Sequence, residues 1–558
     1  MATAIPLAPT TRSTAERLFP RLTPAQIARV ARLGRVRPLR AGEILYDTGD
    51  PHAPFLLVVA GRVEVVRRGA DRDELIADLG PGQFTGEVNL LAGRRTLVRA
   101  VATEPGEAVE LDRERLLGLV QTDAEIGELL MRAFILRRVE LISRGVGDAI
   151  VIGSTHCART LGIKEFLTRN AHPFTYVDLD GEPDVQALLD RFHVTTADIP
   201  VVVCRCEFVL RHPTDAQIAE CLGLNATVDV SNVHDVIVVG GGPAGLAAAV
   251  YAASEGLDVL VVEARSPGGQ AAASSKIENY LGFPTGISGQ ALAGRAFAQA
   301  QKFGAQVLIA HGAVRLHCAE TPYRVDVDAG TSLRARAIVV ATGAEYRKPL
   351  LPELPRFEGL GVYYGATFME AQLCVDEEVV VVGGGNSAGQ AAVYLAETAR
   401  RVHVLVRSAG LAETMSRYLV RRIEEHPSIT LHAHTEVVAL EGDGHLERVR
   451  WRNNLTGDTE SLAIRHVFVM TGAVPATSWL DGCLALDPRG FVLTGPDLAT
   501  DTLADAKWPL PRSPYLLETS LPGVFAVGDV RAGNVKRVAS AVGEGSIAIS
   551  FVHRVLAE

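Results

Sequence analysis

The sequence predicts a multidomain α/β protein with an N-terminal β-barrel, a compact α/β unit and two nested domains built on parallel sheets. Short β-rich runs separated by Gly turns occupy about 37–111, and apolar residues at helical spacing follow over 123–144. Strands and helices alternate over 149–224. Glycine-rich segments at 240–245 and 383–388 each follow an apolar strand and open a helix of small residues. This repeated pattern predicts the two parallel-sheet domains.

Length and composition fit a protein of three or four domains, since 558 residues with 47% hydrophobic and 22% charged content can bury several cores. The net charge of -10 argues against nucleic acid or an anionic membrane as a partner, because the average field repels both. Residues 1–12 lack the basic and apolar parts of a signal peptide, and no apolar run reaches bilayer length. We therefore expect a cytoplasmic protein.

The seven cysteines are an odd number and include no CxxC pair, which is not the pattern of a disulfide framework. They fit a reducing compartment. Cys204 and Cys206 face the same side of a predicted strand, about 6.6 Å apart by the strand rise, which would strain a direct disulfide. We expect both to be packing residues. The sequence predicts no metal site.

The glycine-rich segments are typical of Rossmann-like dinucleotide-binding domains. The first glycine makes a tight turn, the second lets backbone N–H groups approach a pyrophosphate, and the third position allows the helix to pack closely on the strand. Ala388 fills the third position in the second copy, which the packing tolerates. The residues predicted to hold the two pyrophosphates are Gly240, Gly242, Pro243, Ala244 and Gly245 in the first copy and Gly383, Gly385, Asn386, Ser387 and Ala388 in the second.

The residue that ends the next strand distinguishes the two sites. It is Glu263 after the first segment and Arg407 after the second. A carboxylate accepts hydrogen bonds from the free ribose diol of FAD or NAD, whereas a guanidinium pairs with the 2'-phosphate of NADP. The first site is therefore predicted to bind FAD and the second NADPH. Arg407 is followed by Ser408, and Ala412 stands where a second arginine would help. A single arginine can still form a bidentate contact with the phosphate, so NADPH is favoured and NADH is the less favoured alternative.

The NADPH-binding domain is predicted to be inserted in the FAD-binding domain. A strand end at 341–343 closes the first domain, and the segment 523–529 returns to it. The polar stretch 225–234 lacks periodicity and is the expected linker. The predicted domains are 1–145 for the barrel with its helix, 148–225 for the compact α/β unit, 233–345 with 471–558 for FAD binding, and 346–470 for NAD(P)H binding.

Several motifs of the C-terminal half resemble those of the low-molecular-weight thioredoxin reductase family. These motifs are Gly268-Gly269-Gln270, Ile-Glu-Asn-Tyr at 277–280, Ala-Thr-Gly at 341–343, the second glycine segment, and Gly528-Asp529. The resemblance implies that Gln270 and Asn279 lie along the flavin and that Asp529 hydrogen-bonds the ribityl or pyrophosphate part of FAD. It also implies a homodimer. Further cofactor contacts are implied at Gly269, Ala341, Thr342, Gly343, Gly472, Gly528, Lys536, Arg537 and Val538.

One motif of that family is missing. The family has a Cys-Ala-Thr-Cys segment before the strand of the second glycine segment, which passes electrons from flavin to thioredoxin. Here the stretch 364–370 reads Tyr-Gly-Ala-Thr-Phe-Met-Glu, with Gly365 and Phe368 in place of the cysteines. Neither residue can attack a disulfide or resolve a mixed disulfide, so reduced flavin must discharge elsewhere. Cys374, six residues past Phe368, is expected to be a packing residue.

The leading hypothesis is an NADPH-dependent FAD oxidoreductase. In this hypothesis NADPH gives a hydride to FAD N5, and the reduced flavin passes electrons to oxygen, a quinone, ferredoxin or a partner protein. One alternative is genuine thioredoxin-disulfide reductase activity with Cys157 as a substitute thiol. A non-enzymatic alternative is a flavin-loaded sensor whose barrel binds a ligand or partner.

The N-terminal barrel resembles a cyclic-nucleotide-binding domain through Gly42-Glu43, Gly49-Asp50, 55–57, 61–65 and 84–91. The resemblance implies Glu87 on the ribose 2'-hydroxyl and an arginine on the cyclic phosphate. Thr96 occupies the expected position of that arginine, with Arg94, Arg95 and Arg99 nearby. The alternatives are a barrel that binds a cyclic nucleotide through a neighbouring arginine and a purely structural or dimerising barrel.

The compact α/β unit resembles a thioredoxin or glutaredoxin fold. Ile199-Pro200 stands where that fold keeps a cis-proline, and Ser-Thr-His-Cys-Ala-Arg-Thr at 154–160 stands at its active-site loop. A single thiol at a helix N-terminus can have a lowered pKa, so Cys157 is a candidate catalytic residue of the monothiol type. The alternative is an inert residue in a degenerate binding fold.

Overall fold

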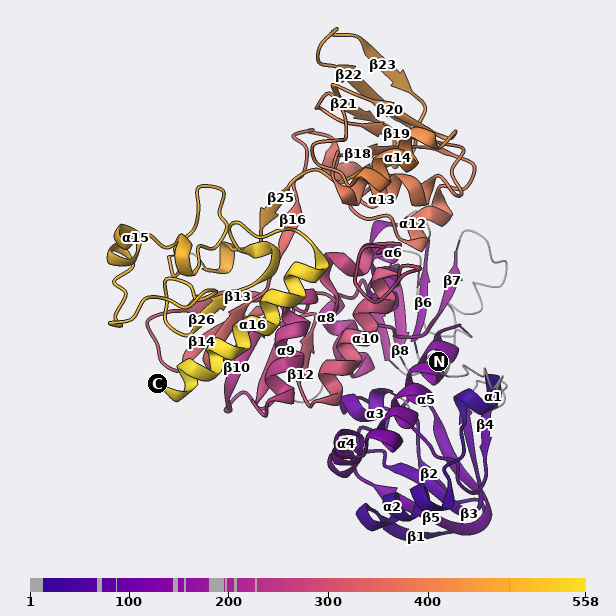
Figure 1. Cartoon of the computed structure of the whole chain (residues 1–558). Coiled ribbons are helices and arrows are strands. Elements are labelled where there is room, and N and C mark those ends of the chain that lie inside the picture. Colours follow the sequence, from indigo (N-terminus) through magenta and orange to yellow (C-terminus); the bar gives the residue numbers. More distant parts are fainter. Residues whose placement is uncertain are drawn as a thin grey trace, which may run out of the picture.

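The computed structural model describes residues 14–67, 73–86, 88–143, 149–154, 157–179, 195, 198–204, 208–225, 228–480 and 482–558. Figure 1 shows a central lobe around β10, an N-terminal domain and an inserted lobe at opposite ends, and a middle domain around β6 between these ends. None of the helices in these ranges combines the length and apolar character needed to cross a bilayer.

The N-terminal domain is a five-stranded antiparallel sheet with helices. Its strands lie in the order β1-β5-β3-β4, and β2 pairs with β5. The runs 55–59 and 61–66, which the sequence separates by a Gly turn, form the single strand β3, where Gly61 with φ of +81° lies at a register shift. The elements are α1 (Thr14–Leu18), α2 (Pro24–Leu33), β1 (Arg35–Leu39), β2 (Ile44–Tyr46), β3 (Phe55–Arg67), β4 (Glu74–Leu79), α3 (Val88–Ala92), β5 (Arg99–Leu111), α4 (Arg113–Thr122) and α5 (Ala124–Ser143).

The middle domain has a four-stranded mixed sheet in the order β7-β6-β8-β9. β6 is parallel to β7 and antiparallel to β8, which is antiparallel to β9. The Ile199-Pro200 peptide bond is cis. Residues 180–194, Cys206 and, in the N-terminal domain, Glu87 lie outside the described residues. The elements are β6 (Ala149–Gly153), α6 (Ala158–Arg169), β7 (Phe174–Asp178), β8 (Val201–Cys204), β9 (Phe208–Arg211) and α8 (Asp215–Leu222).

The central lobe is built on a seven-stranded sheet in the order β12-β11-β10-β15-β14-β13, with β26 beside β15. The pairs among β10, β11, β12, β15 and β26 are parallel, whereas β13 and β14 extend the sheet in antiparallel direction. The elements are β10 (Val233–Val239), α9 (Pro243–Ser254), β11 (Val259–Glu263), η2 (Gly269–Ala273), α10 (Gly289–Lys302), β12 (Gln306–Ile309), β13 (Ala313–His317), β14 (Tyr323–Val327), β15 (Thr331–Val340), β26 (Val524–Ala526) and α16 (Val538–Ala557).

The inserted lobe lies between β15 and β26 in the chain. A two-stranded ribbon, β16 (Ala344–Tyr346) and β25 (Ala473–Pro475), joins it to the central lobe. Its parallel sheet has the order β17-β24-β18-β19-β20, and β21-β22-β23 form an antiparallel sheet beside it. The elements are β17 (Val362–Tyr363), α12 (Phe368–Leu373), β18 (Glu378–Val382), α13 (Asn386–Leu395), β19 (Arg401–Leu405), α14 (Arg417–Glu425), β20 (Ile429–His432), β21 (Thr435–Glu441), β22 (Arg448–Asn453), β23 (Thr459–Leu462) and β24 (His466–Val469).

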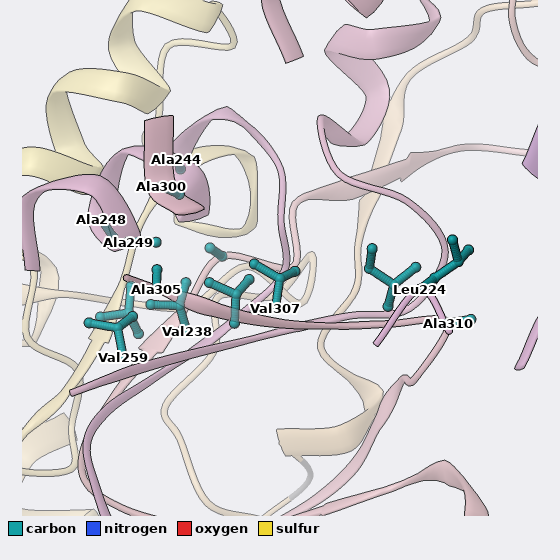
Figure 2. Close-up of a cluster of buried hydrophobic side chains, with 14 of the residues drawn as sticks. Leu224, Val238, Ala244, Ala248, Ala249, Val259, Ala300, Ala305, Val307 and Ala310 are labelled. Carbon is teal, nitrogen blue, oxygen red and sulfur yellow. The ribbon is translucent and has the colours of Figure 1, made fainter. Parts of the chain in front are cut away.

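Small residues let the helices of the central lobe approach its sheet closely. Ala244 and Ala248 of α9 belong to the same buried cluster as Val259 of β11, as Figure 2 shows. A Cβ on Gly545 of α16 would lie 2.2 Å from the Ala244 carbonyl oxygen, so only glycine permits this approach. The cluster also contains Leu224, which follows α8 (Figure 2). The middle domain and the central lobe therefore share one hydrophobic core.

A disulfide joins Cys318, just after β13, to Cys483, just after the short helix η4 (Ser478–Leu480). The prediction that the cysteines form no disulfide is wrong for this pair. The two residues are 165 positions apart in the sequence, so no local spacing could indicate the bond, and only the fold brings their Cα atoms to 5.7 Å. Cys157 and Cys374 are free thiols.

Candidate functional site

The first glycine segment forms a tight turn between β10 and α9. Gly240 adopts φ of +107°, and a Cβ there would lie 2.3 Å from the Ala341 carbonyl oxygen. A Cβ on Gly245 would lie 1.8 Å from the Gly240 carbonyl oxygen. Both positions therefore exclude a side chain. Gly242 caps α9 without a side-chain hydrogen bond, which leaves the first N–H groups of the helix available to an anionic ligand.

Glu263 ends β11 beside this turn, and backbone donors hold its carboxylate. Its Oε2 accepts a hydrogen bond from the Gly241 N–H at 2.7 Å. Its Oε1 accepts from the N–H groups of Arg265 and Ser266 at 2.9 and 3.1 Å. Each carboxylate oxygen can accept more than one hydrogen bond, so the oriented group can still receive one from a ribose hydroxyl.

The turn opens into a cavity of about 1220 Å³ that the central lobe, the inserted lobe and α6 of the middle domain enclose. This volume exceeds the roughly 300–1,000 Å³ typical of a site for one small molecule. The α9 N-terminus supplies donors for a pyrophosphate and Glu263 supplies acceptors for a ribose, which fits a dinucleotide. Predicted cofactor residues that line the cavity are Gly240, Gly242, Pro243, Ala244, Glu263, Gly269, Gln270, Asn279, Ala341, Thr342, Gly343, Asn386, Ser387, Gly528, Asp529, Lys536, Arg537 and Val538.

Several predicted site residues lie outside this lining. Gly383, like Gly245, is needed because the backbone around it leaves no room for a side chain. A Cβ on Gly383 would lie 2.4 Å from the Met470 carbonyl oxygen. Arg407 is exposed two residues past β19. The predicted residues outside the lining are Cys157, Gly245, Gly383, Gly385, Ala388, Arg407, Ser408 and Gly472.

Asp529 and Lys536 form a charged pair at the end of the cavity near the N-terminus of α16. Burial raises the pKa of the Asp529 carboxyl, and the nearby Lys536 ammonium opposes that rise. Burial also lowers the pKa of Lys536, whose Nζ donates a hydrogen bond to the Asp529 carbonyl oxygen at 3.1 Å. Gln270 is fixed by donation from its Nε2 to the Ala344 carbonyl oxygen at the start of the ribbon.

Tyr346 links the ribbon to the second glycine segment. It lies on the ribbon strand β16, burial raises the pKa of its hydroxyl, and that hydroxyl is hydrogen-bonded to the side chain of Ser387 at the start of α13. The negative charge of the Asp529 carboxylate also raises the pKa of the Tyr346 hydroxyl. An ion pair between Arg422 of α14 and Glu278 of the central lobe, 2.7 Å from Nη1 to Oε2, joins the lobes at a second point. The two predicted nucleotide sites therefore meet at one cavity.

The stretch 363–367 forms another wall of this cavity. The Tyr364 hydroxyl donates a hydrogen bond to Glu358 at 2.6 Å, and Glu358 is paired with Lys348 at 2.7 Å. Cys374 is fully buried in the core of the inserted lobe, and burial raises its pKa to about 12. The thiol therefore remains protonated at neutral pH and cannot act as a nucleophile.

Comparison with known proteins identifies the two lobes. Residues 234–545, more than half of the chain, match the family described as pyridine nucleotide-disulphide oxidoreductase. The chain belongs to this family.

This oxidoreductase is 34% identical over 327 residues to the thioredoxin reductase of Mycolicibacterium smegmatis, which covers 58% of this chain and 97% of that protein. It is 31% identical over 326 residues to the thioredoxin reductase of Bacillus subtilis (strain 168), covering 58% and 96%. The structure of Lactococcus lactis thioredoxin reductase in the FR conformation matches 58% of this chain and 99% of that one, with 25% identity and a TM-score of 0.52.

The oxidoreductase is an NAD(P)H-dependent flavoprotein, and membership of the family implies FAD and NADPH as its cofactors. Residues 36–123 match the family described as cyclic nucleotide-binding domain. The predicted combination of a Rossmann-like pair of lobes with an N-terminal domain of that kind is therefore confirmed.

The oxidoreductase should lose FAD affinity when Glu263 is replaced by Gln. The amide nitrogen would face backbone N–H groups that now donate to the carboxylate, so we expect the FAD dissociation constant to rise about tenfold, or about 1.4 kcal/mol. Titration of apoprotein with FAD, followed by the quenching of flavin fluorescence, measures this constant. Glu425→Gln is the matched control, because Glu425 is exposed and is paired with Arg421 on the same helix. Equal affinities in the two variants would contradict the role of Glu263.

Two groups of lining residues escaped the sequence analysis. The first is Lys348 with Glu358 and Tyr364, and the second is a set of side chains from α6, including Leu161 and Glu165. The members of the first group lie apart in the sequence with loops between them, and their residue types occur on any protein surface, so no motif indicated them. The second group belongs to another domain, so the apolar spacing of α6 reports its own core rather than the cavity it faces.

Proposed function

We propose that this oxidoreductase uses NADPH to reduce FAD and that its reduced flavin passes electrons to an acceptor other than a dithiol of the same chain. The observation that carries the proposal is the presence of Gly365 and Phe368 where the resembling reductases have two cysteines. The buried Cys374, with its raised pKa, is no substitute. Bound FAD and NADPH would supply the electron-transfer chemistry, and the chain supplies binding and orientation.

The contacts of the described residues support specific roles. The N–H groups at the start of α9 would bind the FAD pyrophosphate, and Glu263 would receive the ribose hydroxyls. Asn386 and Ser387 at the start of α13 would hold the NADPH pyrophosphate close to the ribbon that carries Tyr346. Asn386 is itself fixed, because its Oδ1 accepts a hydrogen bond from the Ser416 N–H at 2.7 Å.

Anaerobic mixing with NADPH tests the first half of the proposal. NADPH should bleach the flavin absorbance, and a protein whose flavin stays oxidised would contradict it. An acceptor screen then tests the second half, with oxygen, a quinone, ferredoxin and a disulfide offered to the reduced enzyme. Turnover with the disulfide alone would contradict the proposal that no dithiol relay operates.

A rival proposal is thioredoxin-disulfide reductase activity through Cys157. It has one structural point in its favour, because Cys157 caps α6 and the next residue, Ala158, lines the cavity. NADPH-dependent reduction of a disulfide substrate by wild type that is lost in Cys157→Ser would favour the rival. Equal rates in both proteins would dismiss it.

Arg407 is proposed to select NADPH over NADH. Arg407→Ala should raise the KM for NADPH about tenfold, since a charge-assisted phosphate contact is lost, and leave the KM for NADH unchanged. Flavin bleaching at a series of coenzyme concentrations measures both constants. Arg400→Ala is the control, because Arg400 is exposed beside the same sheet and pairs with Glu378. An unchanged preference in Arg407→Ala would overturn the assignment.

We also propose the domain boundaries given by the sequence: 1–145, 148–225, 233–345 with 471–558, and 346–470. The middle domain is proposed to be thioredoxin-like, which its β7-β6-β8-β9 strand order and its cis Ile199-Pro200 bond support. The N-terminal domain is proposed as a regulatory module that binds a cyclic nucleotide.

Two of the arginines near Thr96, Arg94 and Arg99, are engaged with other groups. Arg99 pairs with Asp47 through two hydrogen bonds of 2.7 and 2.9 Å. Arg94 lies over the Phe297 ring of α10, 5.0 Å from its centroid. A cyclic phosphate would therefore compete with contacts already made, and we expect weak binding. Calorimetric titration with cyclic AMP and cyclic GMP tests the module, and the absence of heat at millimolar ligand would end the proposal.

A further inference from the structure

The cavity has a wall that belongs to neither lobe of the oxidoreductase. Leu161, Gly162 and Glu165 of α6 line it from the middle domain. Polar contacts fix α6 in this place. The Arg169 Nη2 donates to the Gly269 carbonyl oxygen at 2.7 Å, directly at the flavin motif η2.

A second polar contact holds the adjacent residue at the C-terminal end of α6. The Gln290 Nε2 of α10 donates to the Thr168 carbonyl oxygen at 2.9 Å. At the other end of the helix, a Cβ on Gly359 of the inserted lobe would lie 3.1 Å from the Cβ of Ala158. The middle domain also shares its core with the central lobe. The helix is therefore a fixed part of the cavity and touches both lobes.

The segment 359–373 of the inserted lobe also lines this cavity, including the stretch where the resembling family has its dithiol. The space beside this segment is therefore lined by residues of two domains, with α6 on the side of the middle domain. Such a lining suits a small-molecule acceptor.

The side chains of this segment suit a planar ring. Tyr363 and Tyr364 line the cavity together with Leu161 and Leu373. The Tyr363 ring is held by stacking on His466, with centroids 6.0 Å apart and an interplanar angle of 19°. Aromatic and aliphatic faces of this kind bind flat apolar molecules by stacking and burial.

Glu370 lines the same space and is suited to donate a proton. It accepts hydrogen bonds from both the N–H and the hydroxyl of Thr367, as the N3 residue of a capping box does. Burial raises the pKa of its carboxyl, the hydrogen bonds from Thr367 oppose that rise, and the Glu165 carboxylate of α6 adds to it, so the pKa is raised on balance. The other titratable groups that interact with it are Tyr363, Cys374 and Tyr394, which are also acids. The carboxyl therefore holds its proton to a higher pH than an ordinary glutamate.

We propose that α6 and the segment 359–373 form the acceptor site, that its ligand is a small quinone, and that Glu370 donates a proton to a quinone oxygen. This inference rests on the proposed function and names its acceptor. Overall, quinone, NADPH and one proton give hydroquinone and NADP+. The quinone gains two electrons from NADPH, and an O–H bond forms at each carbonyl oxygen. One hydrogen corresponds to the hydride that NADPH gives up, the other is a proton from Glu370, and solvent reprotonates the carboxylate.

The first test fills the site from the side of α6. Gly162 faces the cavity, and a Cβ there would have only the Arg159 Nη1 within 4 Å, at 3.8 Å, so a larger side chain fits the helix. Gly162→Leu should weaken binding of 1,4-naphthoquinone to the oxidised holoenzyme and lower its kcat/KM, both at least about tenfold. Gly118→Leu in α4, where a Cβ meets nothing within 4 Å, is the matched control and should change neither.

The second test addresses the proton. Gln at position 370 can keep the capping hydrogen bond, so Glu370→Gln should fold and retain FAD. The protonated carboxyl is the active form, so wild-type kcat for the quinone should fall as pH rises through the raised pKa of Glu370. Glu370→Gln should have a kcat lower by at least about tenfold and lack this alkaline limb, and Glu370→Asp should restore the limb in part.

The outcomes separate the two proposals. Flavin that NADPH does not bleach overturns the proposed function itself. Flavin that NADPH bleaches but 1,4-naphthoquinone neither binds nor reoxidises overturns the acceptor site alone. If Gly162→Leu binds the quinone as wild type does, α6 is not part of the acceptor site. If Glu370→Gln keeps the wild-type pH profile, Glu370 is not the proton donor. If Gly162→Leu loses flavin, the quinone affinity and kcat/KM of Gly162→Ala and of the Glu370 variants decide whether the acceptor site is assigned correctly.

Discussion

Purified Gly245→Ala should contain almost no FAD. The added methyl carbon would lie 1.8 Å from the Gly240 carbonyl oxygen, which belongs to the backbone and cannot turn aside. Either α9 moves off the sheet or the turn opens, and both displace the N–H groups that would meet the pyrophosphate. We expect FAD affinity to fall at least about 100-fold, or about 3 kcal/mol. The ratio of flavin to protein absorbance after gel filtration measures the loss.

Two companion variants separate loss of cofactor from loss of fold. A Cβ on Gly242 would meet its nearest atom, the Gly269 Cα, at 3.9 Å, so Gly242→Val fits the protein but occupies the space of the pyrophosphate. It should fold with wild-type circular dichroism and lack FAD. Gly118→Ala, where nothing lies within 4 Å, should keep full flavin content. Wild-type flavin in Gly245→Ala would refute the assigned turn.

Glu518→Gln should cause a large loss of stability although it lies outside the nucleotide sites. Glu518 is fully buried, and its carboxylate pairs with the Arg512 guanidinium at 2.6 and 3.1 Å. It also accepts hydrogen bonds from the N–H groups of Tyr515 and Gly523 at 2.8 and 2.9 Å. A neutral amide would leave a partly buried cation without its buried partner and bring an amide nitrogen against backbone donors. This should cost about 3 kcal/mol.

Thermal unfolding of the holoenzyme measures this loss, and we expect the midpoint to fall by about 5 °C or more. Arg421→Ala is the control, since it removes an ion pair with Glu425 in which both side chains are largely exposed. Its midpoint should stay within about 1 °C of wild type, because such pairs contribute little. Equal midpoints for Glu518→Gln and wild type would contradict the stabilising role of the buried pair.

Local backbone requirements made part of the site predictable. Gly240 and Gly245 are required because a turn of this shape has no room for a Cβ, and that constraint is written in consecutive residues. Glu263 could be recognised for a similar reason, since it ends the strand after the turn, and strand ends in parallel sheets meet at one edge. The missing dithiol was equally visible, because it is a matter of residue identity at Gly365 and Phe368.

Contacts between distant segments were not predictable. Cys318 and Cys483 are joined although 165 residues separate them, and the prediction of no disulfide failed for that reason. The strand β3 continues through Gly61, because pairing with β5 absorbs a shift of register that a turn signal in the sequence does not reveal.

The sequence by itself determined that two nucleotide-binding lobes, one nested in the other, follow two further domains, and that Gly365 and Phe368 stand where the resembling family has its cysteines. These features depend on short stretches in which chemistry and backbone geometry coincide. Only the tertiary structure decided what surrounds the cavity: α6 of the middle domain lines it, and its Glu165 acts electrostatically on Glu370 of the inserted lobe. Burial and the approach of charges are properties of packed surfaces, and they exist only once segments far apart in the chain have met.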